Sequence, residues 1–200
     1  MIIVEHAGKR PVIHPTAYVA PNAVVCGDVE IGEDSRVLFG AVITAEGAPI
    51  RIGKGVIIME NAVVRASGGR KRSFPTTIGD YVFIAPNAHI SGATLEYRAY
   101  VGTGAVVLNG ATVERNAAVT VGSIVHIQTR IPAETVVPLH HIVIGDPCRV
   151  YSSGQADMVI DELMRRNFRE YVFGLAEREI LAEKYSRHLG MHLKDKLLKR

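Results

Sequence analysis

The sequence contains no tryptophan, only two cysteines and few aromatic residues. Aromatic residues make up 6% of the 200 positions, whereas hydrophobic residues as a whole make up 48%. This composition predicts a folded chain whose interior is filled by Val, Ile and Ala, because bulky rings do not fit a narrow repeating core. Cys26 and Cys148 lie far apart and lack the spacing of metal ligands, which favours a reduced, cytoplasmic setting.

Long apolar runs and strong net charge are missing too. No stretch approaches about 18 uncharged apolar residues, so no membrane span is predicted. The N-terminal residues MIIVEHAGKRP lack the basic segment, apolar run and cleavage site of a signal peptide. A net charge of +3 is too mild for a dedicated nucleic-acid binder. We therefore expect neither a membrane nor a nucleic acid as partner.

What the chain does contain is a repeat of six residues. Aliphatic residues recur at this period, at Ile13, Val19, Val25, Ile31, Val37, Ile43, Ile52, Ile58, Val64, Ile78, Ile84, Ile90, Leu95, Val101, Val107, Val113, Val119, Val125, Ile131, Val137 and Val143. Small residues commonly follow four positions later, as at Ala17, Ala23, Ser35, Ala41, Ala62, Ala88, Ala99, Ala105, Ala111, Ala117 and Ser123. A fixed period kept this long predicts a repeat architecture.

Neither a helix nor an ordinary strand explains this period. A helix repeats apolar residues at three and four positions, and a strand alternates them. Turn formers lie between the aliphatic residues, at Pro21-Asn22, Gly27-Asp28, Glu33-Asp34, Gly79-Asp80, Pro86-Asn87 and Thr103-Gly104. Each hexad therefore predicts a short strand and a tight corner, and three hexads make one triangular turn. The sequence predicts an all-β solenoid, a parallel β-helix of hexapeptide type.

The period is interrupted at three places. Three extra residues occur around 47–49, a longer insertion occurs around 68–75, and one residue is missing between Ile90 and Leu95. Insertions in a solenoid are expected to project as loops on one side, often the functional side. We interpret the longer insertion as a solvated loop, with attraction of an anion such as phosphate as the alternative role of Arg70, Lys71 and Arg72.

The sequence divides into three segments: an N-terminal segment over 1–12, the β-helix over 13–150, and a C-terminal helix with a basic tail over 156–200. The helix is predicted from apolar residues at three- and four-residue steps, namely Ile160, Leu163, Met164, Phe168, Tyr171, Val172 and Leu175. The stretch beyond Glu177 is more charged and ends in basic residues.

The repeats, their interruptions and the segment Ile144-Gly145-Asp146-Pro147-Cys148 together resemble the γ-class carbonic anhydrases. These form a branch of the hexapeptide-repeat superfamily, whose β-helix is left-handed. The resemblance covers roughly residues 10–175. It implies a left-handed coil, a C-terminal helix that packs back along it, and a homotrimer. In that family three histidines bind zinc at a subunit interface, two from one subunit and one from its neighbour, and the open fourth position activates water.

The positions that carry these histidines hold other residues here. The first is expected directly after the strand at 61–64, where this chain has Arg65. The second and third lie five residues apart and correspond to Pro86 and Ser91. The guanidinium of Arg65 stays protonated and has no lone pair to donate, so it is incompatible with the usual zinc site. We therefore predict no metal at these former ligand positions.

Counting hexads places a column of residues on one face, at Cys26, Thr44, Arg65, Ser91 and Leu108. This column is predicted to be the former site, with Pro86 on the adjacent face. The residues predicted to line it are Thr44, Glu46, Glu60 and His89. We interpret His89 as a corner residue that faces solvent or another subunit. The alternative is a metal ligand acting with Glu60 or Glu46 of a neighbouring subunit. His126 is predicted to be a surface or interface histidine on a later face.

These observations favour a γ-carbonic-anhydrase-like protein without zinc hydratase activity, acting as a trimeric binding or scaffold module with an unidentified protein partner and no cofactor. Residues 44–53 and 131–138 also resemble parts of the two small left-handed-helix subunits of dynactin, which lack the zinc ligands. One alternative is a hexapeptide-type acyltransferase that uses acyl-CoA, although no histidine lies on a long loop to serve as its general base. The other is an anhydrase-like enzyme that holds zinc in an altered metal site.

Overall fold

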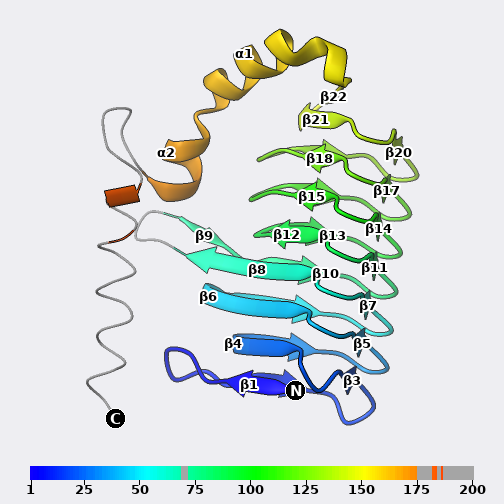
Figure 1. Cartoon of the computed structure of the whole chain (residues 1–200), viewed down its shortest axis with the longest axis vertical. Helices are drawn as coiled ribbons and strands as arrows, with labels where there is room; N and C mark the ends of the chain where they lie inside the picture. Colours follow the sequence, from blue (N-terminus) through cyan, green and yellow to red (C-terminus); the bar gives the residue numbers. More distant parts are fainter. Residues whose placement is uncertain (69–71, 175–181, 184–185, 187–200) are drawn as a thin grey trace.

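The hexapeptide repeats fold into a β-solenoid of about eight turns (Figure 1). The structure, a computed structural model, describes residues 1–68, 72–174, 182–183 and 186. Most repeats form a two-residue strand followed by a corner, and strands from successive turns pair in parallel. The predicted architecture is confirmed. The N-terminal segment 1–12 is part of it, because Ile2–Val4 pairs in parallel with Val24–Cys26.

The solenoid has three faces. Face 1 stacks β1 (Ile2–Val4), β4 (Val24–Ile31), β6 (Val42–Ile52), β8 (Val63–Gly68), β12 (His89–Ser91), β15 (Val106–Val107), β18 (Ile124–Val125) and β21 (Ile142–Gly145). Face 2 comprises β2 (Val12–Ile13), the ends of β4 and β6, β10 (Thr76–Ile78), β13 (Thr94–Leu95), β16 (Thr112–Val113) and β19 (Arg130–Ile131). Face 3 stacks β3 (Tyr18–Val19), β5 (Arg36–Val37), β7 (Ile57–Ile58), β11 (Phe83–Ile84), β14 (Tyr100–Val101), β17 (Ala118–Val119) and β20 (Val136–Val137).

The repeated aliphatic residues fill the interior as three columns, one for each face. Beyond the first turn every member of these columns is at most 4% exposed, whereas Ile13 and Val19 at the open end are only partly buried. Full burial of one Val or Ile side chain contributes roughly 1.5–3 kcal/mol. Apart from the partly buried Ala17, the small residues of the repeat lie buried at the corners. Where that residue is Ser35, its hydroxyl donates a hydrogen bond to the carbonyl of Gly53 at 2.8 Å.

The tight corners use left-handed backbone conformations, as the turn residues predict. Asn87 and Gly104 have φ values of 58° and 64°. The corner predicted at Gly79-Asp80 differs, because the left-handed residue is Tyr81, with φ of 58°. Asp80 instead accepts a hydrogen bond at Oδ1 from the backbone N–H of Lys54, 2.8 Å away. Its side chain thus ties one turn to the next.

All three interruptions lie at the corner between faces 1 and 2, and the two insertions differ in structure. The extra residues at 47–49 do not project as a loop, because they lie inside β6 and shift its register against β4. The insertion after Val64 instead extends β8, which pairs antiparallel with β9 (Ser73–Phe74) and forms a projecting hairpin (Figure 1). The expectation of projecting loops is thus wrong for the first interruption. Of the basic residues, Arg70 and Lys71 lie outside the described residues.

The C-terminal segment closes the last turn and then folds back beside the hairpin (Figure 1). β22 (Cys148–Tyr151) pairs antiparallel with β21, and the 3₁₀ helix η1 (Ser153–Gln155) leads into α1 (Ala156–Arg166) and α2 (Phe168–Phe173). Asn167, with φ of 41°, separates the two helices, and its side chain accepts a hydrogen bond from the backbone N–H of Glu170. The predicted helix is therefore present from Ala156, but Asn167 divides it into two helices.

The apolar stripe predicted for this helix does not pack as one face. Val159 and Leu163 pack with Ile144 and Tyr151 in a second small core. Ile160 and Met164, which the periodicity assigned to the same stripe, are instead among the exposed hydrophobic residues of α1. Most of the predicted basic tail lies outside the described residues. Within the part of the chain that the structure describes, no helix is long and apolar enough to cross a membrane.

Candidate functional site

The column predicted from the period exists in the structure. Parallel pairing on face 1 places Cys26 beside Thr44, Thr44 beside Arg65, and Arg65 beside Ser91. Leu108 continues the column, since it follows Val107, the partner of Ile90. All these residues lie where face 1 turns into face 2. The register that stacks the aliphatic core therefore also brings these side chains together.

Arg65 is held in this column by an ion pair. Its Nη2 lies 3.2 Å from Oε2 of Glu46, which belongs to the neighbouring strand β6. The two side chains are 34% and 40% exposed, so water screens their attraction. Thr76 anchors the same strand by donating its hydroxyl to the backbone carbonyl of Arg65. The site thus joins a carboxylate to a permanent cation, and the cation offers no lone pair to a metal.

His89 lies on the outer side of face 1, two residues before Ser91. Burial lowers the pKa of its imidazole, and the positive charge of Arg65 lowers that pKa further. A neutral imidazole can ligate a metal, but it needs additional ligands. Among the described residues, no group of three or more His, Cys, Asp and Glu side chains is arranged to hold a metal ion. His89 therefore has no such set of metal-ligand partners within the described chain.

Pro86 and Glu60 lie at the opposite edge of face 1, at the corner with face 3. Their turns are adjacent, because the backbone N–H of Asn87 donates to the carbonyl of Glu60 at 3.0 Å. Pro86 precedes strand β12, whereas Ser91 is the last residue of that strand. One chain therefore brings Arg65 and Ser91 together but leaves Pro86 at the other edge of the face.

One further residue belongs to the column but was not predicted from the sequence, His126. It lies eighteen residues after Leu108, one full turn of the solenoid, whereas it was predicted to be a surface or interface histidine on a later face. In the structure it is 8% exposed, and its ring centroid lies 5.9 Å from that of Phe168 in α2. Its Nδ1 is buried and has no hydrogen-bond partner among the described residues. Burial, followed by the charge of Arg166, lowers the pKa of His126 to about 4.

A second missed feature is the chemistry of the outward positions on each face. On face 1 the residue before each core residue is aliphatic except at His89, as shown by Val24, Val42, Val63, Val106, Ile124 and Ile142. The corresponding residues on face 2 are polar apart from Val12, namely Glu30, Arg51, Thr77, Thr94, Thr112 and Arg130. Face 3 presents aromatic residues at three of these positions, and Phe83 stacks on Tyr100 with centroids 5.7 Å apart. All three patterns are visible in the sequence at the position directly before each repeated aliphatic residue.

Comparison with known proteins agrees with this architecture. A family model described as bacterial transferase hexapeptide (six repeats) matches residues 10–45. The mitochondrial gamma carbonic anhydrase 2 of Arabidopsis thaliana is 39% identical over 130 residues, which cover 64% of this chain and 47% of that protein. A carbonic anhydrase of Geobacillus kaustophilus is 31% identical over 108 residues, covering 54% of this chain and 57% of that protein. The chain thus spans about half the length of these curated relatives.

Among solved structures, a hexapeptide transferase family protein from Anaplasma phagocytophilum superimposes with a TM-score of 0.54 at 25% sequence identity. The match covers 88% of this chain and 98% of that one. Both kinds of comparison therefore lead to the same repeat architecture, one through sequence and the other through the fold.

Proposed function

This chain is a hexapeptide-repeat β-helix protein related to the γ-carbonic anhydrases, and we propose that it acts as a trimeric binding or scaffold module without zinc hydratase activity. The observation that carries the proposal is the ion pair of Arg65 with Glu46, 3.2 Å apart. By the resemblance to the family, Arg65 occupies the position where we expect the first zinc-ligating histidine. A guanidinium cannot ligate zinc, and here it also pairs with a neighbouring carboxylate.

The other two positions do not fit zinc either. Ser91 presents a neutral hydroxyl, which is a poor zinc ligand at neutral pH, and the ring of Pro86 offers no donor atom. With Arg65 beside Ser91, a metal at this corner would meet a positive charge in place of a lone pair. The residues present therefore do not fit a zinc ion.

The outer surface of face 1 supports the trimer. Its six aliphatic side chains form a column along the solenoid that only His89, between Val63 and Val106, interrupts among the described residues, and each of the six is only partly buried in the single chain. A contiguous apolar strip is typical of a surface that another molecule covers. A second copy would bury it, and cyclic threefold symmetry closes the assembly without leaving the strip open. We place the protein in the cytoplasm, because its only two cysteines, Cys26 and Cys148, lie far apart in sequence and suit a reduced setting.

Metal analysis, a CO2 hydration assay and light scattering test this proposal together, on protein purified without chelators. We expect less than about 0.1 zinc per chain, no hydration above the uncatalysed rate, and a mass three times that of one chain. About one tightly bound zinc or iron per chain, together with hydration activity, would refute the proposal that the protein lacks hydratase activity. That result would favour the altered metal site, in which His89 acts with Glu46 or Glu60 of a neighbouring subunit.

Acyl transfer is the second candidate, favoured by the similarity to the Anaplasma phagocytophilum transferase-family structure. Against it, no histidine occurs in the insertion that forms the projecting hairpin. Calorimetry with acetyl-CoA separates the two proposals. A dissociation constant below about 100 µM would favour acyl transfer, whereas an absence of binding heat would leave the scaffold proposal in place.

A further inference from the structure

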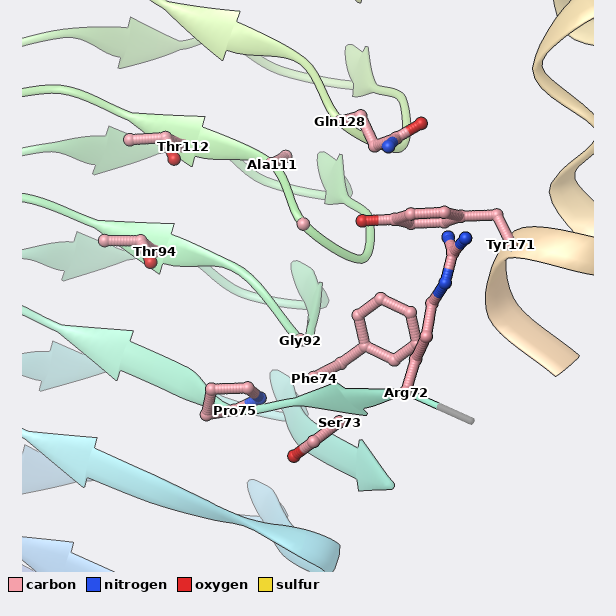
Figure 2. A pocket seen from close by; sticks show the side chains of 11 residues that line it. Arg72, Ser73, Phe74, Pro75, Gly92, Thr94, Ala111, Thr112, Gln128 and Tyr171 are labelled. Atoms are coloured by element: carbon pink, nitrogen blue, oxygen red, sulfur yellow. The ribbon is translucent and has the colours of Figure 1, made fainter. Parts of the chain in front are cut away.

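A cleft lies between the β8–β9 hairpin, face 2 and helix α2 (Figure 2). It has a volume of about 570 Å³, within the usual range for small-molecule sites. Its walls come from three parts of the chain that are far apart in sequence. The residues that matter for its chemistry are Arg72, Phe74, Thr94, Thr112, Gln128 and Tyr171.

Glycine shapes the end of the cleft beneath α2. The hydroxyl of Tyr171 lies where a Cβ atom on Gly110 would be, so only glycine allows this approach. Gly92 has the same relationship to Phe74, because an added Cβ would lie 2.5 Å from the Cβ of Phe74. The rings of Phe74 and Tyr171 meet edge to face, with centroids 5.2 Å apart. The aromatic wall is therefore fixed by packing.

Among the residues that the structure describes, Arg72 is the only charged one that lines the cleft. Its Cζ lies 4.6 Å from the centroid of the Tyr171 ring, a cation–π contact that holds the guanidinium at the aromatic wall (Figure 2). Within the described part of the chain, no carboxylate lines the cleft and Arg72 forms no ion pair. Its hydrogen-bond donors are therefore available to an anion from outside the chain.

Neutral donors lie across the cleft from this cation. Thr94 and Thr112 are neighbours in register on face 2, and both side chains are seen at the cleft wall in Figure 2. Burial raises the pKa of Tyr171, although Arg72 lowers it, so the phenol is a neutral donor at neutral pH. Gln128 adds an amide at the rim. One cation and several neutral donors thus border an aromatic wall.

We propose that this cleft binds a small organic anion, a carboxylate or a phosphate monoester. Its charged end pairs with Arg72, and its apolar body lies against Phe74 and Tyr171. The guanidinium fork matches both kinds of oxyanion, and the neutral hydroxyls opposite complete the coordination of its oxygens. The site is separate from the Arg65 column and does not depend on the proposed loss of zinc activity.

Calorimetry on the full chain tests the site with four probes: benzoate, phenyl phosphate, inorganic phosphate and benzyl alcohol. We expect benzoate or phenyl phosphate to bind with a dissociation constant below about 1 mM, and inorganic phosphate and benzyl alcohol to bind at least tenfold more weakly. A preference for benzoate identifies a carboxylate ligand, and a preference for phenyl phosphate identifies a phosphate monoester. Equal binding of benzyl alcohol, or no saturable binding of either aromatic anion below about 10 mM, overturns the proposal.

Matched variants locate the binding. Arg72→Gln should weaken the binding of the preferred anion at least about tenfold, because a charge-assisted hydrogen bond is lost. Arg98→Gln is the control, since Arg98 lies over Tyr97 in the same kind of contact, with Cζ 4.9 Å from the ring centroid, but outside the cleft. Thr112→Val, which keeps the shape of the side chain, should weaken binding about threefold and provides a second test if Arg72→Gln unfolds. Unchanged affinity in both cleft variants would refute the assignment.

Discussion

The guanidinium of Arg65 and the carboxylate of Glu46 form an ion pair across strands β8 and β6, with Nη2 and Oε2 3.2 Å apart. It lies at the corner of faces 1 and 2, in the same column as Thr44 and Ser91. The column is continuous in register, and its side chains differ from the zinc-binding histidines that the family resemblance leads us to expect there. The interaction is structural in character, and its contribution can be measured separately from any activity.

Breaking the pair should change stability only slightly. Glu46→Gln is expected to lower the free energy of unfolding by about 0.5 kcal/mol, because both side chains are partly exposed and water screens the attraction. A double-mutant cycle with Arg65→Met, measured by urea unfolding, gives the pair energy. It should fall further as salt is raised. A pair energy above about 2 kcal/mol would contradict this description of the site.

Restoring histidine at all three former ligand positions should recruit zinc. Arg65→His, Pro86→His and Ser91→His together are expected to raise the zinc content to about one per chain, provided that the variant is trimeric. The double variant that keeps Pro86 is the control, because it lacks the ligand expected from the other edge of face 1. A folded, trimeric triple variant that binds no more zinc than this control would show that the three positions do not meet.

The buried imidazole of His126 should make the fold less stable in weak acid. Its pKa is lowered to about 4 from the ordinary value of 6.5. Between about pH 6.5 and pH 4, the unfolded chain therefore binds a proton at this imidazole that the native chain does not bind. The stabilisation is complete above pH 6.5 and is lost as the pH falls towards 4, to a limit of about 3 kcal/mol.

Thermal unfolding at pH 7 and pH 5 provides the measurement. His126→Leu should reduce the difference in melting temperature between the two pH values, whereas substitution of the exposed His14 by Gln should leave it unchanged. Some dependence will remain, because burial and Arg65 also lower the pKa of His89. An undiminished difference in the His126→Leu variant would show that this residue does not titrate as described.

A charge on the outer column of face 1 should prevent self-association. Val106→Glu places a carboxylate in the middle of the aliphatic strip, where a second copy would have to desolvate it, and we expect a monomer by light scattering. Thr77→Glu makes the same addition on face 2 and should remain trimeric. A trimeric Val106→Glu variant would place the subunit interface on another face.

The contact between Gly110 and Tyr171 should control how α2 docks. Gly110→Ala puts a Cβ where the Tyr171 hydroxyl lies, whereas Gly104→Ala meets no atom within 4 Å. The backbone φ values are similar, 73° and 64°, so both substitutions bear about 1 kcal/mol of left-handed strain. Hydrogen exchange of residues 168–173 should therefore rise in Gly110→Ala alone. Equal exchange in the two variants would show that α2 is held in place without this contact.

The six-residue period by itself predicts most of the fold. Because each turn holds three hexads, the period assigns Val25, Ile52 and Ile58 to the cores of three different faces. It also predicts that Thr44, Arg65 and Ser91 are neighbours, which the pairing confirms. Extending the same count by eighteen residues would have added His126. These neighbours can be predicted from the sequence because hydrogen bonding between stacked strands fixes the register.

Only the tertiary structure decides what happens where the period is broken. Residues 47–49 become part of a strand, the insertion after Val64 becomes a hairpin, and Asn167 divides the helical segment. These outcomes depend on packing between segments that do not repeat. The burial of His126 and the cleft at Arg72 have the same origin, since both arise where α2 returns to the solenoid. The sequence thus determined the scaffold through a repeated local rule, whereas the surface chemistry required contacts between distant segments that no period encodes.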